Sequence, residues 1–267
     1  MVNAWRMIDT GADDAAFNMA LDEAIAIHVR EEHDLPTLRI YSWSQRSVSI
    51  GSLQRSADLR IGYCRDKGIA VVRRPTGGRA VLHGDELTYS FSVQTRKGLF
   101  SHGLLDSYNK ISTALVSALL KAGLSPQSIM RGRHATSGSR CLHSPLCFRS
   151  VSYGEIAVNG MKVIGSAQKR WKDGLLQQGS ILLSVDEGEV CDVFQPDAVE
   201  ISGRSLIGLK QVMPELSHDH LKRAIRNAFE ETFQITLVNS LPTQGERTLA
   251  HDLERIKYRA DTWTFRR

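Results

Sequence analysis

The segment Arg73–His83, with the sequence RRPTGGRAVLH, constrains the fold of this chain more than any other segment. A run rich in β-branched residues, Ile69–Val72, precedes it, and Leu87–Val93, where apolar and polar residues alternate, follows it. Both flanks are typical of strands. The adjacent Gly77 and Gly78 allow positive φ and a close approach of a ligand to the main chain, and arginines beside exposed N–H groups favour an anion or a polarised carbonyl. The segment is therefore either a ligand-binding loop or a tight hairpin turn with solvated charges.

Hydrophobic periodicity elsewhere predicts both helices and strands. Helices are expected at Asp13–Arg30, Ser56–Lys67, Gly103–Ala122, Ser217–Phe233 and Gln244–Lys257. Strands are expected at Leu38–Trp43 and Ser47–Ser52, and antiparallel strands are expected between Glu155 and Val185. Asn159-Gly160 is the strongest short hairpin signal within that last group. Turn-forming residues from Ser125 to Leu146 predict a long loop, which inside a compact domain is usually functional or mobile.

The length of 267 residues suits a single domain over 1–267, with the alternative that about 187–267 form a small helical C-terminal appendage. No apolar run approaches the roughly 20 residues that span a bilayer, and the first residues lack the apolar core of a secretory signal. We therefore expect a cytoplasmic protein without a membrane partner. Cysteines in that compartment are usually free thiols, and there are four of them: Cys64, Cys141, Cys147 and Cys191.

The formal net charge is +5, and the basic residues are scattered along the chain. There is no basic block with interleaved aromatic residues, so the sequence does not indicate a nucleic-acid-binding protein. A modest positive charge fits an enzyme whose substrates are attached to acidic carrier proteins, since complementary charge speeds encounter. The same charge could also serve only to keep the protein soluble.

Three segments occur in an informative order: AFNMALDEA at 16–24, RRPTGGRAVLHGDELTYSF at 73–91, and EIAVNGMKVIGSAQ at 155–168. Together they resemble the signature segments of the lipoate-protein ligase and octanoyltransferase superfamily. The resemblance implies an α+β fold of the biotin/lipoate ligase catalytic-domain type, with a mixed, mainly antiparallel sheet and packed helices. Weaker resemblance runs from the N-terminus to about Ser184, and we expect a single catalytic domain over 1–267.

Cys147 follows the predicted long loop and precedes the predicted hairpin. On its own a single cysteine is only a candidate nucleophile, and an inert buried thiol is the commoner case. The position of Cys147 resembles that of the cysteine in the octanoyltransferases that form an acyl-thioester intermediate, which synthetase-type ligases usually lack. The chain departs from that branch at Val151, where the branch often has proline.

Lys162 lies in the segment that resembles the lysine-bearing hairpin of the family. A cation close to a thiol lowers the thiol pKa, and it can stabilise the negative charge that develops on an acyl carbonyl oxygen. The resemblance therefore assigns a catalytic role to Cys147 and Lys162. Without the resemblance, Lys162 would be an ordinary exposed lysine on a hairpin.

The remaining candidate site residues are expected to shape an acyl pocket. Arg74, Gly77, Gly78 and His83 would form its carbonyl end, and Gly165, Ser166 and Ala167 would form a narrow wall beside the acyl chain. His83 is either an acid or base or a histidine held by hydrogen bonds within the fold. The small residues are either a wall or a closely packed strand. Cys141, His143 and Cys147 lack a fourth ligand in the usual spacing of structural zinc sites, so we expect no metal.

The resemblance implies an octanoyltransferase that needs no cofactor. It would move an octanoyl group from acyl carrier protein, through a thioester on Cys147, to a lysine of a lipoyl-domain protein such as the glycine-cleavage H protein. One alternative is an ATP-dependent lipoate-protein ligase, which shares the fold and both motifs. The other is a non-catalytic family member that binds lipoyl proteins.

Overall fold

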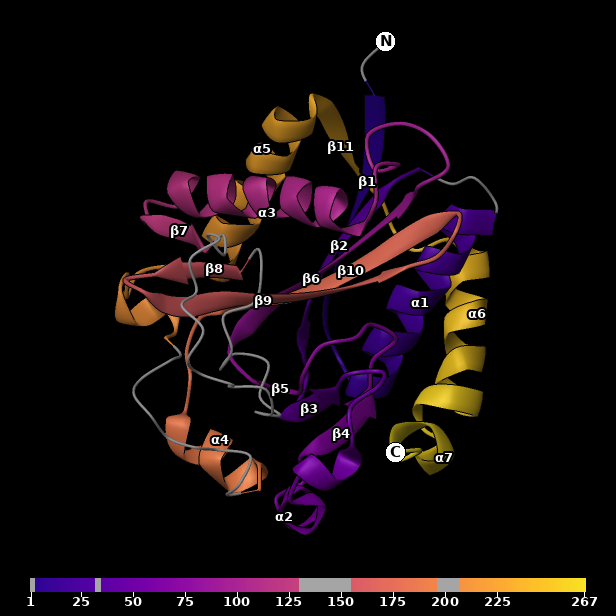
Figure 1. Cartoon of the computed structure of the whole chain (residues 1–267), viewed down its shortest axis with the longest axis vertical. Coiled ribbons are helices and arrows are strands. Elements are labelled where there is room, and N and C mark those ends of the chain that lie inside the picture. Colours follow the sequence, from indigo (N-terminus) through magenta and orange to yellow (C-terminus); the bar gives the residue numbers. More distant parts are fainter. Residues whose placement is uncertain (1–2, 32–34, 130–154, 196–206) are drawn as a thin grey trace, which may run out of the picture.

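The computed structural model describes residues 3–31, 35–129, 155–195 and 207–267. Its largest element is an eight-stranded sheet with the order β11-β1-β2-β6-β10-β9-β8-β7 (Figure 1). In that order the strands are Ile235–Asn239, Asn3–Asp13, Thr37–Trp43, Glu86–Gln94, Gly174–Leu182, Met161–Arg170, Glu155–Val158 and Pro126–Ile129. The strand β1 is parallel to both of its neighbours, and the pairings from β2 to β7 are antiparallel. The predicted mixed, mainly antiparallel sheet is confirmed.

A second sheet of three strands holds β3 (Ser47–Ile50) between β4 (Ala70–Arg73) and β5 (Val81–His83). The strand β3 is parallel to β4 and antiparallel to β5. Because β4 and β5 lie on opposite sides of β3, the glycine-containing segment between them crosses the end of β3 instead of closing a hairpin. The interpretation of this segment as a tight hairpin turn is therefore wrong.

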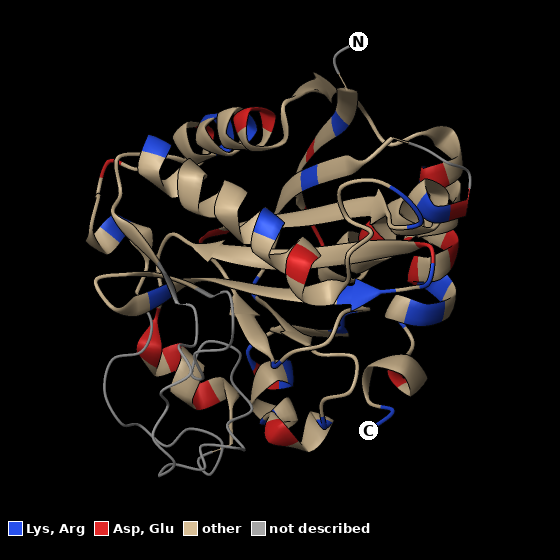
Figure 2. Ribbon diagram, turned by 45° about the horizontal axis from the view of Figure 1, so that its top comes forward, with Lys and Arg blue, Asp and Glu red and all other residues tan. Residues whose placement is uncertain are grey.

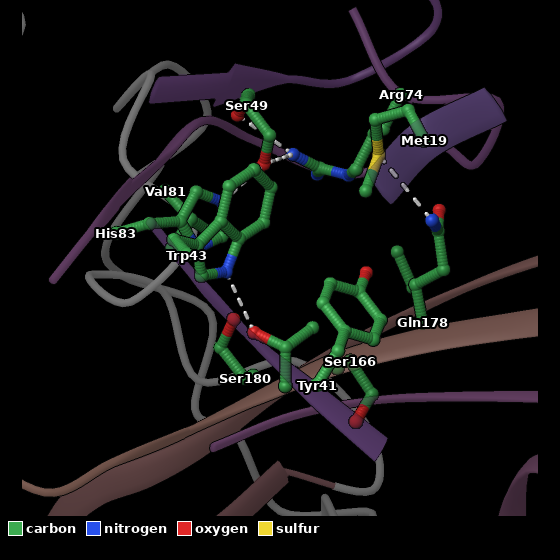
Figure 3. Close-up of a pocket in the computed structure, with 14 residues that line it drawn as sticks. Met19, Tyr41, Trp43, Ser49, Arg74, Val81, His83, Ser166, Gln178 and Ser180 are labelled. Atoms are coloured by element: carbon green, nitrogen blue, oxygen red, sulfur yellow. Dashed lines mark hydrogen bonds between the residues drawn. The ribbon is translucent and has the colours of Figure 1, made fainter. Parts of the chain in front are cut away.

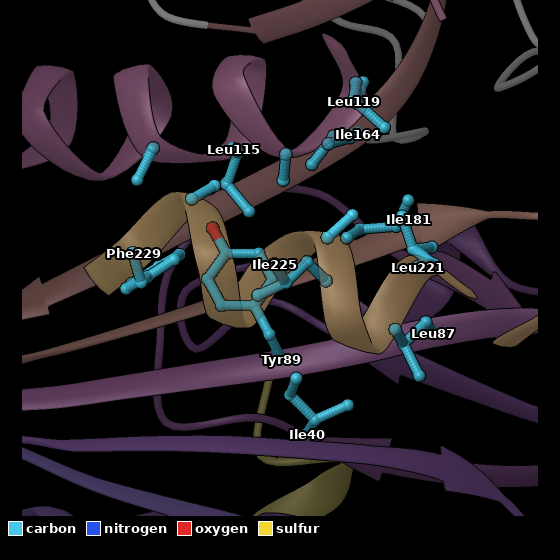
Figure 4. Packing of buried hydrophobic residues seen from close by; sticks show 14 of the residues in the cluster. Ile40, Leu87, Tyr89, Leu115, Leu119, Ile164, Ile181, Leu221, Ile225 and Phe229 are labelled. Carbon is cyan, nitrogen blue, oxygen red and sulfur yellow. The ribbon is translucent and has the colours of Figure 1, made fainter. Parts of the chain in front are cut away.

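The two faces of the main sheet have different chemistry, and β6 shows the difference. Its residues Leu87, Tyr89, Phe91 and Val93 belong to the main hydrophobic core, which α3 (Leu104–Lys121) and α5 (His218–Phe233) complete (Figure 4). The intervening residues Glu86, Thr88, Ser90 and Ser92 are polar but equally buried. The helix α1 (Ala15–Glu31) packs on this polar face, and α6 (Gln244–Leu253) packs on α1. A buried polar face requires hydrogen-bond partners, and it provides the floor of the site described below.

Two expected elements differ from the prediction. The segment 56–67 is not one helix but a 3-10 turn, η1 (Ser56–Asp58), followed by the short helix α2 (Ile61–Asp66). Between them Leu59 is extended, bridges to Phe194 and is buried against the small sheet, and this contact outweighs the local helical preference. The loop expected from Ser125 begins instead with β7, which pairs with β8.

The C-terminal part contributes to the main sheet as well as supplying helices. Its described elements after α4 (Glu187–Val193) are a 3-10 turn (Leu209–Gln211), α5, β11, α6, a π-helical turn (Glu254–Tyr258) and α7 (Asp261–Thr264). The edge strand β11 pairs with β1, and Arg6 of β1 forms a buried ion pair with Glu246 of α6 at 2.7 Å. The region 187–267, for which a small helical appendage is the alternative, thus also supplies a strand of the main sheet, whereas the division of the chain into domains stays a prediction. None of the described helices is long and apolar enough to cross a membrane.

Candidate active site

A pocket opens between the polar face of the main sheet, the small sheet and the start of α1 (Figure 3). Of the residues that the sequence indicates, Arg74, His83, Gly165, Ser166 and Ala167 line it. Its other lining residues are Met19, Tyr41, Trp43, Ser49, Val81, Thr88, Gln178, Gly179 and Ser180. Two motifs that are far apart in sequence, the glycine-containing segment and the hairpin strand β9, therefore form one cavity.

Arg74 holds the glycine-containing loop in shape. Its guanidinium is almost fully buried and donates hydrogen bonds to the carbonyl oxygens of Ser49 (2.9 Å), Gly77 (2.7 Å) and Arg79 (2.6 Å). A fork of five N–H donors suits such a convergence of carbonyl groups. These contacts support the expected role of Arg74 in shaping the pocket, because its N–H groups donate to carbonyl groups of the protein itself.

Gly77 and Gly78 do not line the pocket, but Gly78 lies against its wall. Gly78 has φ +81°, and a Cβ built on it would lie 3.4 Å from the Cβ of Ala167. The loop also presses on the end of β3, since a Cβ built on Gly51 would lie only 1.9 Å from the carbonyl oxygen of Gly78. The small residues on both sides of this contact let the two backbones approach each other.

Gly51→Ala is expected to lower the free energy of unfolding by about 1–3 kcal/mol, because overpacking a filled site forces the backbone to shift. Gly62→Ala is the control, since nothing lies within 4 Å of its Cβ position. Gly62 is inside α2, where alanine is favoured over glycine by roughly 0.5–1 kcal/mol. Urea unfolding of both variants measures the two effects, and an unchanged midpoint for Gly51→Ala would contradict the close contact.

A buried polar network fixes the floor of the pocket. The carboxylate of Asp22 accepts hydrogen bonds from Arg39 (2.7 Å), Tyr41 (2.8 Å) and Ser90 (2.6 Å). It also accepts one from Gln178 at 2.7 Å, and the other end of that amide accepts from Thr76 of the glycine-containing loop at 2.8 Å. The network thus connects α1, β2, β6 and β10 with the loop.

Sequence reasoning did not single out Asp22. One signal was available, because Asp22 lies within the apolar run of the first helix. A charged side chain at such a position is buried only when it is paired, so a buried partner could have been expected. Its partner Arg39 is equally buried, with no exposed side-chain surface. Burial also raises the pKa of the Tyr41 hydroxyl well above its ordinary value, with the Asp22 carboxylate adding to the effect.

His83 is held on both sides by hydrogen bonds. Its Nδ1 lies 2.8 Å from Oε1 of Glu86, and its Nε2 lies 2.7 Å from Oγ of Ser49. The ring of Trp43 stacks on the imidazole with the ring centres 3.8 Å apart. Burial by itself would raise the pKa of Glu86, but the nearby His83 and the hydrogen bonds from His83 and Thr88 outweigh it and lower that pKa. Glu86 is therefore a buried carboxylate.

The hydroxyl of Ser166, a residue of the expected wall, forms a hydrogen bond within the protein. It forms a hydrogen bond of 2.7 Å with the hydroxyl of Tyr89, and Gln177 donates to the same tyrosine oxygen at 2.9 Å. Burial raises the pKa of Tyr89 to about 12. Ser166 thus lines the pocket, and its side chain also connects β9 to β6 through this hydrogen bond.

Lys162 is 2% exposed, so the alternative of an exposed hairpin lysine is wrong. Ile156 of β8 pairs with Ile164, but Ala157 pairs with Lys162, so β9 carries an extra residue there. Val163 and Ile164 are adjacent and both belong to the main core, as expected at a β-bulge, which changes the direction of the side chains beside it.

Strand alternation on either side of the bulge places Lys162 on the same face as Gly165 and Ala167.

Lys162 does not line the pocket itself. It lies three residues before Gly165, a separation of roughly 10 Å along a strand. The bulge therefore directs the lysine to the pocket side of the sheet, near the end of the wall formed by β9. Without the bulge, alternation would place Lys162 and Gly165 on opposite faces.

The expected nucleophile Cys147 lies outside the described residues, as do Cys141 and His143. The two cysteines that the structure describes, Cys64 and Cys191, are free thiols. Within the described ranges, no group of three His, Cys, Asp or Glu side chains could hold a metal ion. The catalytic role of Cys147 stays a prediction from the sequence.

Comparison with known proteins agrees with the fold. Residues 14–230 match the lipoyl protein ligase A/B catalytic domain. Octanoyltransferase LipM of Carboxydothermus hydrogenoformans is 35% identical, covering 99% of this chain and 100% of that protein, and LipM of Moorella thermoacetica is 36% identical, covering 98% of each.

Among solved structures, the bipartite lipoate protein ligase of Thermoplasma acidophilum superposes with a TM-score of 0.80. It is 22% identical and the match covers 98% of this chain and 96% of that one, so it supports the fold alone. The sequence relatives extend over the full length of the chain at more than 30% identity. The chain therefore belongs to the lipoyl protein ligase A/B catalytic-domain family, and the full-length relatives named here are octanoyltransferases LipM.

Proposed function

We propose that this protein is an octanoyltransferase of protein lipoylation. It takes an octanoyl group from acyl carrier protein onto Cys147 and passes it to a lysine of a lipoyl-domain protein, such as the glycine-cleavage H protein. The observation that carries the proposal is the full-length similarity to proteins named as octanoyltransferases. The pocket supports it, because the two family motifs meet there around Gly165 and Ala167.

The chemistry suits a thiol. A thiolate exchanges with a thioester at little cost and yields an acyl-enzyme that is still reactive toward an amine. Lys162, which the bulge in β9 turns to the pocket side, would lower the thiol pKa and stabilise the carbonyl oxygen as negative charge develops. Arg74 and His83 would keep the carbonyl end of the pocket in shape through the hydrogen bonds described above.

The proposed partners are proteins, and we place the reaction in the cytoplasm. Figure 2 shows Lys and Arg on several separate elements, with Asp and Glu among them. With a net charge of +5, such a distribution would favour encounter with an acidic carrier protein without creating one dominant basic surface.

Octanoyl transfer should proceed without ATP or Mg²⁺, because the thioester donor is already activated. The test combines purified protein, octanoyl-acyl carrier protein and apo lipoyl domain, and follows the mass of the lipoyl domain. When the acceptor is withheld, the enzyme itself should gain the mass of one octanoyl group, which hydroxylamine removes.

Two other results would identify the alternatives. Modification that requires free octanoic or lipoic acid together with ATP and Mg²⁺ would make the protein a lipoate-protein ligase. No change in the mass of enzyme or acceptor under either condition would make it a non-catalytic, lipoyl-protein-binding member of the family.

A further inference from the structure

A chain of three side chains leads from the pocket into the protein interior: Ser49 on β3, His83 at the end of β5 and Glu86 at the start of β6. Ser49 lines the pocket, and all three are at least 97% buried. The distances are 2.7 Å from Ser49 Oγ to His83 Nε2 and 2.8 Å from His83 Nδ1 to Glu86 Oε1. We call this chain the Ser49–His83–Glu86 relay.

The direction of the hydrogen bonds follows from the donors around the relay. Nη1 of Arg74 lies 3.2 Å from Oγ of Ser49. A guanidinium only donates, so the serine oxygen accepts from it with one lone pair, and when the His83 ring is neutral the serine hydroxyl donates to Nε2, because that nitrogen then carries no proton. The carboxylate of Glu86 can only accept, so Nδ1 carries the proton of the neutral ring. The imidazole is thus held with its basic nitrogen toward the hydroxyl in the pocket.

Glu86 is set up to stabilise a proton on His83. Its Oε1 is also contacted by Trp43 at 3.1 Å, Thr88 at 2.6 Å and Ser180 at 2.8 Å. Its Oε2 is buried and has no hydrogen-bond partner in the part of the chain that the structure describes. A buried carboxylate oxygen without a partner is costly, and part of that cost is offset when the neighbouring ring becomes positively charged.

The second half of the proposed reaction needs such a base. The acceptor lysine arrives as an ammonium, since the ordinary lysine pKa is about 10.4, and an ammonium cannot attack a carbonyl carbon. Forming the amide removes two protons from this nitrogen, whereas forming the acyl-enzyme requires no amine at all. A base that acts on the lysine would therefore affect the two half-reactions differently.

We propose that the Ser49–His83–Glu86 relay accepts the first of these two protons. The ammonium proton passes to Oγ of Ser49 while the serine proton passes to Nε2 of His83, which gives a neutral amine and an imidazolium beside Glu86. The amine then attacks the thioester carbonyl, the C–S bond breaks, and the second proton leaves with the departing thiolate as a thiol. The imidazolium returns its proton to water. This inference rests on the proposed function, but it does not depend on which thiol carries the acyl group.

The test compares two nucleophiles on a preformed acyl-enzyme in single-turnover experiments. One is the apo lipoyl domain, whose lysine must lose a proton, and the other is hydroxylamine, which is mostly uncharged at neutral pH. Ser49→Ala should slow transfer to the lysine by about 10² or more, the usual contribution of general acid–base catalysis. Cleavage by hydroxylamine should stay at the wild-type rate, as should formation of the acyl-enzyme.

Two variants complete the design. Ser47→Ala is the matched control, because Ser47 is a buried serine on the same strand, two residues away, whose hydroxyl bonds only to the carbonyl of Gln45 among the described residues. It should react at the wild-type rate with both nucleophiles. Ser49→Thr keeps a hydroxyl and a side chain that suits a strand, and it should restore transfer to the lysine.

Equal slowing with both nucleophiles would show that Ser49 only supports the fold of the pocket, and it would overturn the relay. Unchanged transfer to the lysine in Ser49→Ala would overturn it as well. In both cases the wild-type acyl-enzyme still forms, so the proposed function stands. A wild-type protein that never acquires an octanoyl group would overturn the proposed function and the relay together.

Discussion

Cys147→Ala should abolish octanoyl transfer. Removing the nucleophile of a covalent mechanism costs on the order of 10⁴–10⁶ in rate, and no acyl-enzyme should be detected when the acceptor is withheld. The expectation rests on the position of Cys147 in the sequence, before the hairpin that carries Lys162. The measurement is the intact mass of the enzyme together with the rate at which the lipoyl domain is modified.

The other three cysteines serve as controls. Alanine variants at Cys64, Cys141 and Cys191 should each retain transfer. Cys64 is the most informative of them, because it is 1% exposed and packs in the hydrophobic cluster of the small sheet. Cys64→Ala is therefore expected to lower stability while the acyl-enzyme still forms. Near-normal turnover in Cys147→Ala would rule out the acyl-enzyme mechanism.

Lys162→Ala should slow formation of the acyl-enzyme by about 10² or more, the scale of losing one donor to a developing oxyanion. Lys162→Arg should not restore the full rate, since a planar guanidinium differs from an ammonium in shape and reach. The site is 2% exposed, so a larger head group also has little room there. Quenched single-turnover reactions with octanoyl-acyl carrier protein measure the rate of acyl-enzyme formation directly.

Lys172→Ala is the matched control for this lysine. Lys172 is exposed and lies in the turn between β9 and β10, at the opposite end of β9 from Lys162. It should react at close to the wild-type rate. Acylation of Lys162→Ala at the normal rate would remove the lysine from the proposed role and leave its burial without a catalytic explanation.

Most of the elements could be predicted from local patterns. The alternation from Leu87 to Val93 predicted β6, and its apolar half is the half that faces the main core (Figure 4). Asn159 and Gly160 predicted the β8–β9 turn, and both residues indeed have positive φ, 52° and 75°. Such patterns are readable because side-chain period and turn dihedrals depend on neighbouring residues only.

Local sequence patterns did not predict the two parallel strands β1 and β11. Neither β1 nor β11 was predicted, although Asn3–Asp13 and Ile235–Asn239 pair with each other across almost the whole chain. The strand β11 lies at the edge of the sheet, next to β1. Its pairing is decided by where the other strands of the sheet lie, and a local window contains no information on that.

The site divides in the same way. The sequence alone indicated Arg74, His83, Gly165, Ser166 and Ala167, which line one pocket, but it did not indicate the lining residues that come from β2, β6 and β10. Only the tertiary structure decided how other side chains are placed around this pocket. The extra residue at Val163 turns Lys162 to the pocket side. The crossing of the loop over β3 brings Ser49 within hydrogen-bond distance of His83. The physical reason is that residue type and period are local properties, whereas register, bulges and contacts between separate sheets are set by the packing of the whole chain.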